Sequence, residues 1–359
     1  MDSESNHQHD VVSSQSLVDE TIVRTLTTLS LPTLPFDLIP EILSRLSFTK
    51  KHFQLSTASL VHTLTVSSDK YVLKSYPLDS VFTNVTTNPI SELQFPLNVY
   101  FVGSCNGILC FFEEDCHKGF VRFQLWNPSI RKFKELLPLQ QPHTHYLFLY
   151  GFSHDPITNN YKMVVVLRGH GNFVDNHEVK VHTLGTNCWK SIQNIPFGCV
   201  ALQISGKFVS GTLNWLVAKE YDNKIQIFSL DLGSETYKEV LLPREVDAST
   251  LHSQLHSQLG VLRDCLCMVF GYDVWVMKEY KNKESWSKLF TISHIPDLPT
   301  YYGIIKVLHI FEDGQVLLDS TNGYTWKLIF YNSRDGTYKF TEFEFRCEVC
   351  VESLISPCF

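Results

Sequence analysis

The sequence predicts a mainly β protein: a propeller-like array of about five four-stranded units, preceded by a short N-terminal helix. Short stretches of alternating character, separated by Gly, Asn, Asp and Pro, run from about residue 100 to the C-terminus. One layout of strand, polar turn, aromatic residue and second strand recurs about every fifty residues. Aromatic residues make up 13% of the chain, a composition typical of sheets.

Four segments follow from changes in composition along the 359 residues. Residues 1–30 are polar and acidic at their start, lack the apolar core of a signal peptide, and are expected to form a disordered tail. Residues 31–47 carry the helical motif, and 48–100 form a linker with the first strands. Residues 101–359 form the repeating β domain.

The helix is predicted near residues 37–46. Asp37 is a suitable N-cap, and Pro40 falls in the first turn, where its missing N–H costs little. One face is apolar and the other polar. An isolated helix of this length is marginal in water, so its apolar face must be covered, either by the following domain or by a groove on a partner protein. The apolar residues are Leu38, Ile39, Ile42, Leu43 and Leu46.

The stretch LPFDLIPEILSRL, residues 34–46, resembles the opening of the F-box. In that family the motif binds the Skp adaptor of cullin-RING (SCF) ubiquitin ligases. The resemblance implies that this chain would contact the adaptor through the motif's apolar positions. These are Leu34, Pro35, Leu38, Ile39, Ile42, Leu43 and Leu46.

The resemblance stops at Ser47. The family normally continues with further helices, whereas FTKKHFQLST, residues 48–57, is similar to the segment that follows the F-box in plant members. We therefore interpret the junction as an internal deletion that truncates the F-box after its first helix. Such a loss is expected to weaken binding of the adaptor.

The repeat is clearest in five strand pairs, each opening its second strand with an aromatic residue. A unit of about fifty residues holding two hairpins is typical of a propeller blade; a pair of β-sandwiches is the alternative, but gives no reason for this period. Turn residues precede the aromatic in each unit, and for one of them either Gly260 or the pair Arg263-Asp264 could form the turn. The repeated aromatic residues are Phe133, Trp189, Tyr237, Trp286 and Tyr338.

These repeats resemble the plant F-box-associated domain, which is related to kelch repeats. The similarity is carried by GSCNGILCF at 103–111, LWNPSIRKFKELLP at 125–138, GFSHDPITNNYKMVVV at 151–166 and GTLNWLV at 211–217. Trp126, Trp189, Trp215 and Trp286 are expected to be largely buried.

No motif for catalysis, cofactor binding or a metal site stands out. Cys347 and Cys350 form a single CxxC without a second pair, and His252 and His256 read better as a duplicated loop than as metal ligands. Alternating Cys265 and Cys267 suggest packing on one face of a strand. The ten cysteines fit reduced thiols of the cytoplasm or nucleus. We therefore predict no catalytic residue, no cofactor and no metal.

The preferred function is that of a substrate-recognition subunit of an SCF-type ubiquitin ligase, with the helix on the adaptor and the β domain on an unknown target protein. The alternative is a stand-alone interaction domain whose F-box has decayed; an enzymatic propeller would need an acidic cluster in its channel. A net charge of −7 without a basic cluster argues against nucleic acid, and no apolar run is long enough to span a membrane.

Overall fold

The second of two compact units carries all the residues that can be described. The units are Met1–His52 and Phe53–Phe359. The predicted tail, the predicted helix, the adaptor residues from Leu34 to Leu46 and the junction at Ser47 lie outside the described residues. The computed structural model describes residues 59–67, 70–82, 88–96, 99–115, 119–140, 145–169, 177–196, 198–220, 224–244, 246, 257–293, 295, 304–321, 325–341 and 346–358.

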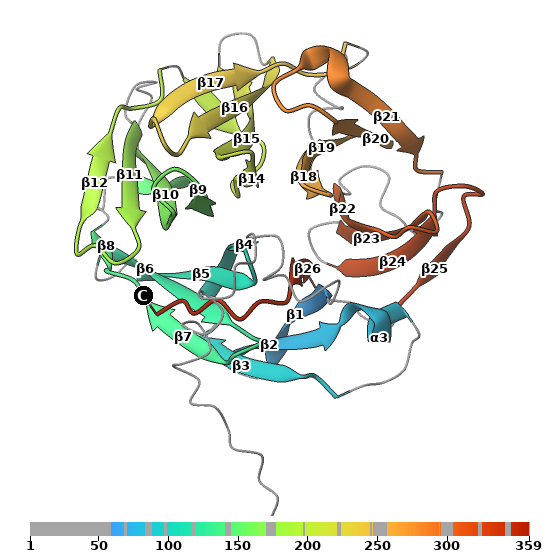
Figure 1. Cartoon of the computed structure of the whole chain (residues 1–359), viewed down its shortest axis with the longest axis horizontal. Coiled ribbons are helices and arrows are strands. Elements are labelled where there is room, and N and C mark those ends of the chain that lie inside the picture. Colours follow the sequence, from blue (N-terminus) through green and yellow to red (C-terminus); the bar gives the residue numbers. More distant parts are fainter. Residues whose placement is uncertain are drawn as a thin grey trace, which may run out of the picture. The chain divides into compact units, whose positions relative to one another are not determined.

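Within these residues the strands form six antiparallel sheets that follow one another around a common centre (Figure 1). Five of them correspond to the five predicted units, and the propeller-like fold is confirmed. Sheet 2 contains β4 (Val99–Cys105), β5 (Ile108–Asp115), β6 (Phe120–Asn127), β7 (Lys132–Glu135) and the short β8 (Leu139–Gln140). Sheet 3 contains β9 (His145–Asp155), β10 (Asn160–Gly169), β11 (His177–Thr183) and β12 (Trp189–Ile192).

The next three sheets repeat this order from the centre outward. Sheet 4 contains β13 (Cys199–Ala201) and β14 (Lys207–Val209), which both pair with β15 (Thr212–Lys219), then β16 (Ile225–Asp231) and β17 (Thr236–Val240). Sheet 5 contains β18 (Gln258–Leu262), β19 (Cys265–Phe270), β20 (Asp273–Met277), the 3-10 turn η3 (Lys283–Ser285) and β21 (Trp286–Thr291). Sheet 6 contains β22 (Ile304–Ile310), β23 (Gln315–Thr321), β24 (Trp326–Asn332) and β25 (Tyr338–Phe340).

Sheet 1 joins the two ends of the β domain. Its strand order is β26 (Arg346–Val351), β1 (Ser59–Ser67), β2 (Lys70–Pro77) and β3 (Ser91–Pro96), with the short helix α3 (Leu78–Phe82) between the last two. The register pairs Ser59 with Val351 and Leu64 with Arg346, so the C-terminal strand lies against the first one. The structure therefore adds a sixth sheet to the five repeats, built from segments on either side of them.

Hydrophobic clusters fill the seams between neighbouring sheets. Side chains alternate along each strand, so a strand in the middle of a sheet contributes to two seams when both faces are covered. Strand β10 shows this arrangement, because Met163 and Val165 pack toward sheet 2 while Val164 and Val166 pack toward sheet 4. Six clusters of this kind, one for each pair of neighbouring sheets, stabilise the ring.

The tight turns agree with most of the sequence prediction. Asn106 and Gly107 both have positive φ, of 50° and 76°, and join β4 to β5. The open choice in sheet 5 is settled in favour of Arg263 and Asp264, at φ 49° and 63°, whereas Gly260 lies inside β18. Gly260 is needed there for a different reason: a Cβ atom would lie 2.8 Å from the Cys267 sulfur.

Three of the repeated aromatic residues, Trp189, Tyr237 and Trp286, link neighbouring sheets by hydrogen bonds. Trp189 Nε1 donates to the Leu137 carbonyl oxygen over 2.9 Å, and Trp286 Nε1 makes the same bond to Leu241. Each acceptor lies just after the outermost main strand of the preceding sheet. Trp126, Trp215 and Trp286 are buried as expected, but Trp189 is half-buried at the edge of its seam.

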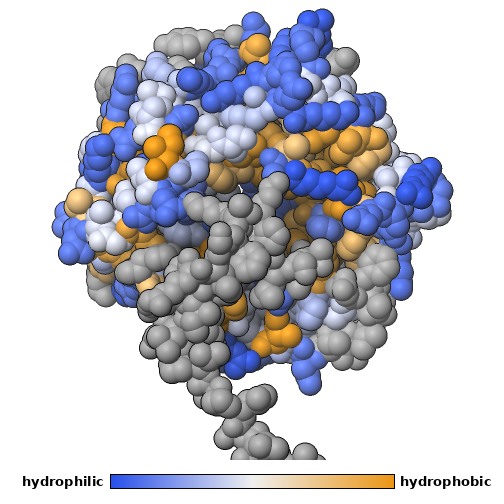
Figure 2. Space-filling view, viewed as in Figure 1, coloured by the Kyte–Doolittle hydropathy of each residue, from blue (hydrophilic) through white to orange (hydrophobic). Residues whose placement is uncertain are grey.

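The surface of the ring is mixed in character. Figure 2 shows hydrophilic residues over much of the outer rim of the face in view, with hydrophobic residues between them nearer the centre. None of the helices in the described part of the chain is long and apolar enough to cross a membrane.

Candidate functional site

The innermost strand of each sheet surrounds a central channel (Figure 1). These strands are β26, β4, β9, β18, β22 and, in sheet 4, both β13 and β14. One end of the channel contains a cavity of about 400 Å³, in the range typical of ligand sites. Its lining includes the turn residues Asn106, Pro156 and Asp264, which places it at the end of the ring where the first hairpin of each sheet turns. We call this space the channel cavity.

Charged groups of both signs line the channel cavity. Lys306 of sheet 6 forms an ion pair with Glu348 of sheet 1, across the seam that closes the ring. Lys207 and Asp264 line the cavity from sheets 4 and 5. The walls therefore combine cationic and anionic side chains, and neither sign dominates.

Two thiols near the cavity are held in the neutral form. Burial raises the pKa of the Cys105 thiol to about 11, against weaker opposing hydrogen bonds from Ser153 and the His154 backbone. Burial likewise raises the pKa of Cys267 to about 12, although the positive charges of Lys207 and Lys306 act in the other direction. Because the thiolate is the nucleophilic form, neither cysteine is suited to covalent catalysis.

A segment of the chain crosses the channel beyond the cavity. We call residues 202–206 the channel bridge. Ser205 Oγ donates to the Val102 carbonyl oxygen on β4 over 2.5 Å. Tyr150 of β9 donates its N–H to the Ile204 oxygen over 3.0 Å, and the Gly206 N–H returns a bond of 2.8 Å to the Tyr150 oxygen.

The channel bridge reaches a third inner strand through one side chain. The Gln203 amide nitrogen donates to the Leu259 carbonyl oxygen over 3.1 Å, and its amide oxygen accepts from the Leu259 N–H over 2.8 Å. Leu259 lies on β18. The bridge thus satisfies backbone groups at the inner edges of sheets 2, 3 and 5.

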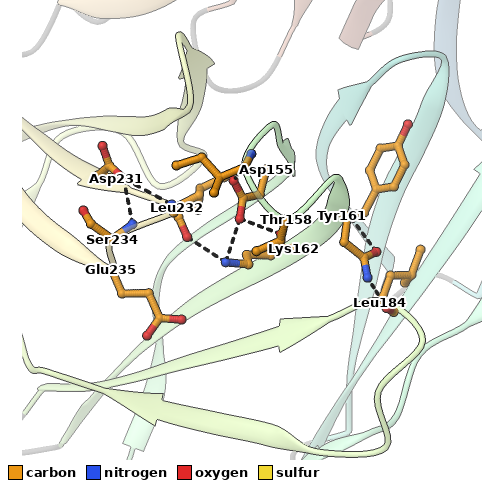
Figure 3. A network of polar contacts seen from close by, with 12 residues as sticks. Asp155, Thr158, Tyr161, Lys162, Leu184, Asp231, Leu232, Ser234 and Glu235 are labelled. Carbon is orange, nitrogen blue, oxygen red and sulfur yellow. Dashed lines mark hydrogen bonds and ion pairs between the residues drawn. The ribbon is translucent and has the colours of Figure 1, made fainter.

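A buried ion pair within sheet 3, outside the channel, is linked to sheet 4 by a hydrogen bond (Figure 3). Lys162 Nζ lies 2.9 Å from Asp155 Oδ2 and donates to the Leu232 carbonyl oxygen over 2.7 Å. Burial by itself raises the pKa of Asp155, but hydrogen bonds from Thr158, Lys162 and the Ile157 N–H outweigh it and hold the pKa below its usual value. Each group of the pair is fully engaged, which favours a structural role.

The CxxC of β26 does not form a metal site. Residues three apart on a strand point to opposite faces, and Cys347 accordingly packs in the seam with sheet 6 while Cys350 packs in the seam with sheet 2. No group of three or more His, Cys, Asp or Glu side chains that could hold a metal ion occurs among the described residues. His252 and His256 lie outside them.

The structure also separates the arginines that a catalytic propeller would gather. Arg168 pairs with Glu220 in the seam of sheets 3 and 4, over 2.5 Å. Arg244 pairs with Glu284, and Arg263 lies in the turn after β18. The sequence analysis did not single out Lys207, Lys306, Asp264 or Glu348 as lining one space, because no local pattern distinguishes them from other strand residues.

Comparison with known proteins identifies the family of the β domain. Residues 59–357 match the model of the F-box associated beta propeller domain. The chain belongs to this family. The matched range includes β1 and β26, so the F-box associated beta propeller domain begins and ends with the strands that close the ring.

Two plant relatives share most of their length with this member of the family. The F-box/kelch-repeat protein At3g23880 of Arabidopsis thaliana is 30% identical over 323 residues, which are 84% of this chain and 82% of the relative. The F-box protein CPR1 of Arabidopsis thaliana is 25% identical over 326 residues, which are 80% of this chain and 74% of the relative.

Proposed function

We propose that this chain is a non-catalytic substrate-recognition subunit of an SCF-type ubiquitin ligase in the cytoplasm or nucleus. The observation that carries the proposal is the match of residues 59–357 to the F-box associated beta propeller domain. The relatives that share this region are named F-box proteins, and residues 34–46 have the pattern of an F-box opening. In this proposal the N-terminal motif holds the Skp adaptor, and the propeller holds a target protein.

The chain contributes proximity. A target bound to the propeller has a high effective concentration near the ubiquitin-loaded enzyme that the ligase carries. The neutral thiols and the scattered arginines agree with this role, since it requires a binding surface and no reacting group on this chain.

Adaptor binding is proposed to depend on the apolar residues of the motif. Replacing Ile42 and Leu43 by Asp places two charges in the contact, and we expect loss of measurable association with the Skp adaptor in a pull-down. Ser44→Asp adds a charge to the polar face of the same helix and serves as the matched control. Circular dichroism shows whether the β domain stays folded. Binding that survives the double change would rule out the helix as the docking element.

The junction after Ser47 is the second test. A helix of about ten residues buries few apolar side chains, worth roughly 1.5–3 kcal/mol each, while association and ordering cost a comparable sum. We therefore expect far tighter adaptor binding by a variant in which the family's later F-box helices are inserted between Ser47 and Phe48. Calorimetry on the two chains measures the difference. Equal affinities would show that the short motif suffices.

The alternative is a target-binding domain whose F-box has decayed. It predicts that the chain as it stands does not bind the adaptor at any accessible concentration, whereas the chain with the inserted helices does. In both functions the propeller binds a target protein, but only the first brings that target to the ligase. Measuring adaptor binding therefore distinguishes them.

A further inference from the structure

Among the described residues the central channel has two successive parts, one crossed by the channel bridge and one that forms the channel cavity. On β4 the channel bridge contacts Val102, and the lining of the channel cavity begins at Gly103. On β9 the bridge pairs with Tyr150, and the cavity lining begins at Phe152. The bridge therefore borders the inner end of the cavity, and the hairpin turns surround its outer end.

The channel bridge shows how the inner strands of this channel bind a peptide segment. Ser205 and Tyr150 form a parallel β-bridge, so part of the bridge runs along β9 as an added strand. The Gln203 and Ser205 side chains add hydrogen bonds with backbone groups of β18 and β4, and the Leu202 and Gln203 N–H groups donate to the Leu216 carbonyl oxygen of β15. A peptide backbone with polar side chains thus satisfies backbone groups on three strand edges at once.

The channel cavity has walls of the same construction. Each innermost strand pairs with a neighbour on one side, and its other edge faces the channel. Alternate residues of such an edge direct N–H and C=O groups away from the sheet, and these groups form hydrogen bonds with an added strand. The cavity is therefore walled by strand edges of the type that the bridge already uses.

The charged side chains that line the channel cavity favour binding of a polar ligand. Lys207 and the Lys306–Glu348 pair lie on its wall, and Asp264 lies at its mouth. An apolar ligand would remove these groups from water without replacing their hydrogen bonds, at a high cost in free energy. A peptide with polar or charged side chains of both signs is complementary to walls that carry both cations and carboxylates.

We propose that the channel cavity binds an extended polar peptide segment of the target protein, which pairs with the inner strand edges as the channel bridge does. This inference rests on the proposed function for the identity of the partner, and on the geometry of the channel for the mode of binding. It assigns the contact to the end of the ring that carries the turns after β4, β9 and β18.

The test uses random heptapeptides displayed on phage and selected on the immobilised full-length chain. Enriched sequences are synthesised with acetylated and amidated ends, and their affinity is measured by fluorescence anisotropy. Gly103→Leu adds bulk to the cavity wall, because Gly103 lines the cavity and a Cβ there would meet Ser205 Oγ only at 3.9 Å. Asp264→Asn removes a charge at the mouth, and Asn tolerates the positive φ of that turn.

We expect enriched peptides to be polar and to bind each of these two variants about tenfold more weakly than the unaltered chain, the effect of losing one charge-assisted hydrogen bond or an equivalent contact. Lys238→Gln is the matched control, because Lys238 is exposed on β17, at the outer edge of sheet 4. Its affinity should not change. Thermal unfolding identifies any variant that has lost its fold; Lys207→Gln then replaces it.

Two results would overturn the proposal. One is the absence of any enriched sequence, and the other is enriched peptides that bind Gly103→Leu and Asp264→Asn as tightly as the unaltered chain. The chain with Ile42→Asp and Leu43→Asp is measured in parallel and should bind the peptides normally. Failure of adaptor binding therefore leaves this test intact, and failure of peptide binding leaves the adaptor test intact.

Discussion

The side-chain amide of Asn127 donates a hydrogen bond of 2.9 Å to the carbonyl oxygen of Ser353, although 226 residues separate the two in sequence. The same nitrogen donates to the Ile355 carbonyl oxygen over 2.8 Å. Asn127 ends β6 in sheet 2 and is fully buried, whereas Ser353 and Ile355 follow β26 of sheet 1. These hydrogen bonds hold the C-terminal segment that follows β26 against sheet 2, across the seam between sheets 1 and 2.

Asn127→Ala should lower the free energy of unfolding more than Asn332→Ala. Both side chains accept a backbone N–H in the turn after the third main strand, Asn127 from Ser129 and Asn332 from Arg334. Only Asn127→Ala also removes the donor from the buried Ser353 carbonyl, at about 1–3 kcal/mol, and from the half-buried Ile355 carbonyl. Urea unfolding of the two variants measures the difference. Equal losses would mean that the C-terminal segment adds nothing to stability.

Gly107→Ala should destabilise the protein more than Gly185→Ala. Both glycines have positive φ, of 76° and 85°, so both substitutions carry the strain of a left-handed backbone. A Cβ at Gly107 would also lie 2.4 Å from Ser353 Cβ and 2.9 Å from the Val351 oxygen, whereas nothing lies within 4 Å at Gly185. Thermal unfolding compares them, and similar midpoints would contradict the close packing of the C-terminal segment.

Lys162→Met should cost about 3–5 kcal/mol, because it leaves the buried Asp155 carboxylate without its cation. Lys190→Met is the matched control, since Lys190 and Glu235 join the same two sheets at 2.6 Å but the lysine side chain is 65% exposed. There the expected loss is below about 1 kcal/mol. Denaturant unfolding of both variants tests the prediction, which fails if the two losses are alike.

Tyr237→Phe should lower the free energy of unfolding by about 1 kcal/mol. The Tyr237 hydroxyl donates to the Gln193 carbonyl oxygen over 2.5 Å and links sheet 4 to sheet 3. Tyr338 occupies the same position in the last repeat, and its hydroxyl makes no hydrogen bond among the described residues. Tyr338→Phe should therefore leave stability nearly unchanged. An equal loss of unfolding free energy in both variants would show that the hydrogen bond of the Tyr237 hydroxyl is not the cause.

Acidification below pH 6.5 should destabilise the fold through His182. Burial lowers the pKa of His182, and its Nδ1 lies 3.0 Å from the Cys188 carbonyl oxygen, to which it can donate while the ring is neutral. The unfolded chain takes up a proton near pH 6.5, whereas the folded chain does so at lower pH. The stability that His182 contributes is therefore complete above pH 6.5 and is lost as pH falls toward the folded-state pKa.

His182→Gln supplies an amide N–H donor in place of the ring N–H and removes the titratable group. The unfolding free energy of this variant should therefore vary less between pH 8 and pH 5 than that of the unaltered chain. His309, whose pKa is also lowered by burial and by the charge of Arg263, contributes in the same direction. The double variant should have the flattest profile. A profile unchanged by His182→Gln would exclude that residue as a source of the pH dependence.

The sequence by itself determined the repeated part of the fold. Side-chain alternation within a strand and turn residues with positive φ are local properties, so the five hairpin pairs, the turn at Asn106-Gly107 and the buried Trp126 and Trp215 could be predicted. The motif at residues 34–46 can likewise be recognised in the sequence, and its binding to the adaptor stays a prediction.

Only the tertiary structure decided which strands and side chains of different sheets contact one another. The pairing of β26 with β1, the seams that cover Cys347 and Cys350, and the bond from Asn127 to Ser353 all depend on closure of the ring. The channel cavity arises in the same way, because Lys207, Lys306 and Glu348 come from three different sheets. Local periodicity specifies which face of a strand is covered; it does not specify which distant strand covers it, since that partner is chosen by the packing of the whole ring.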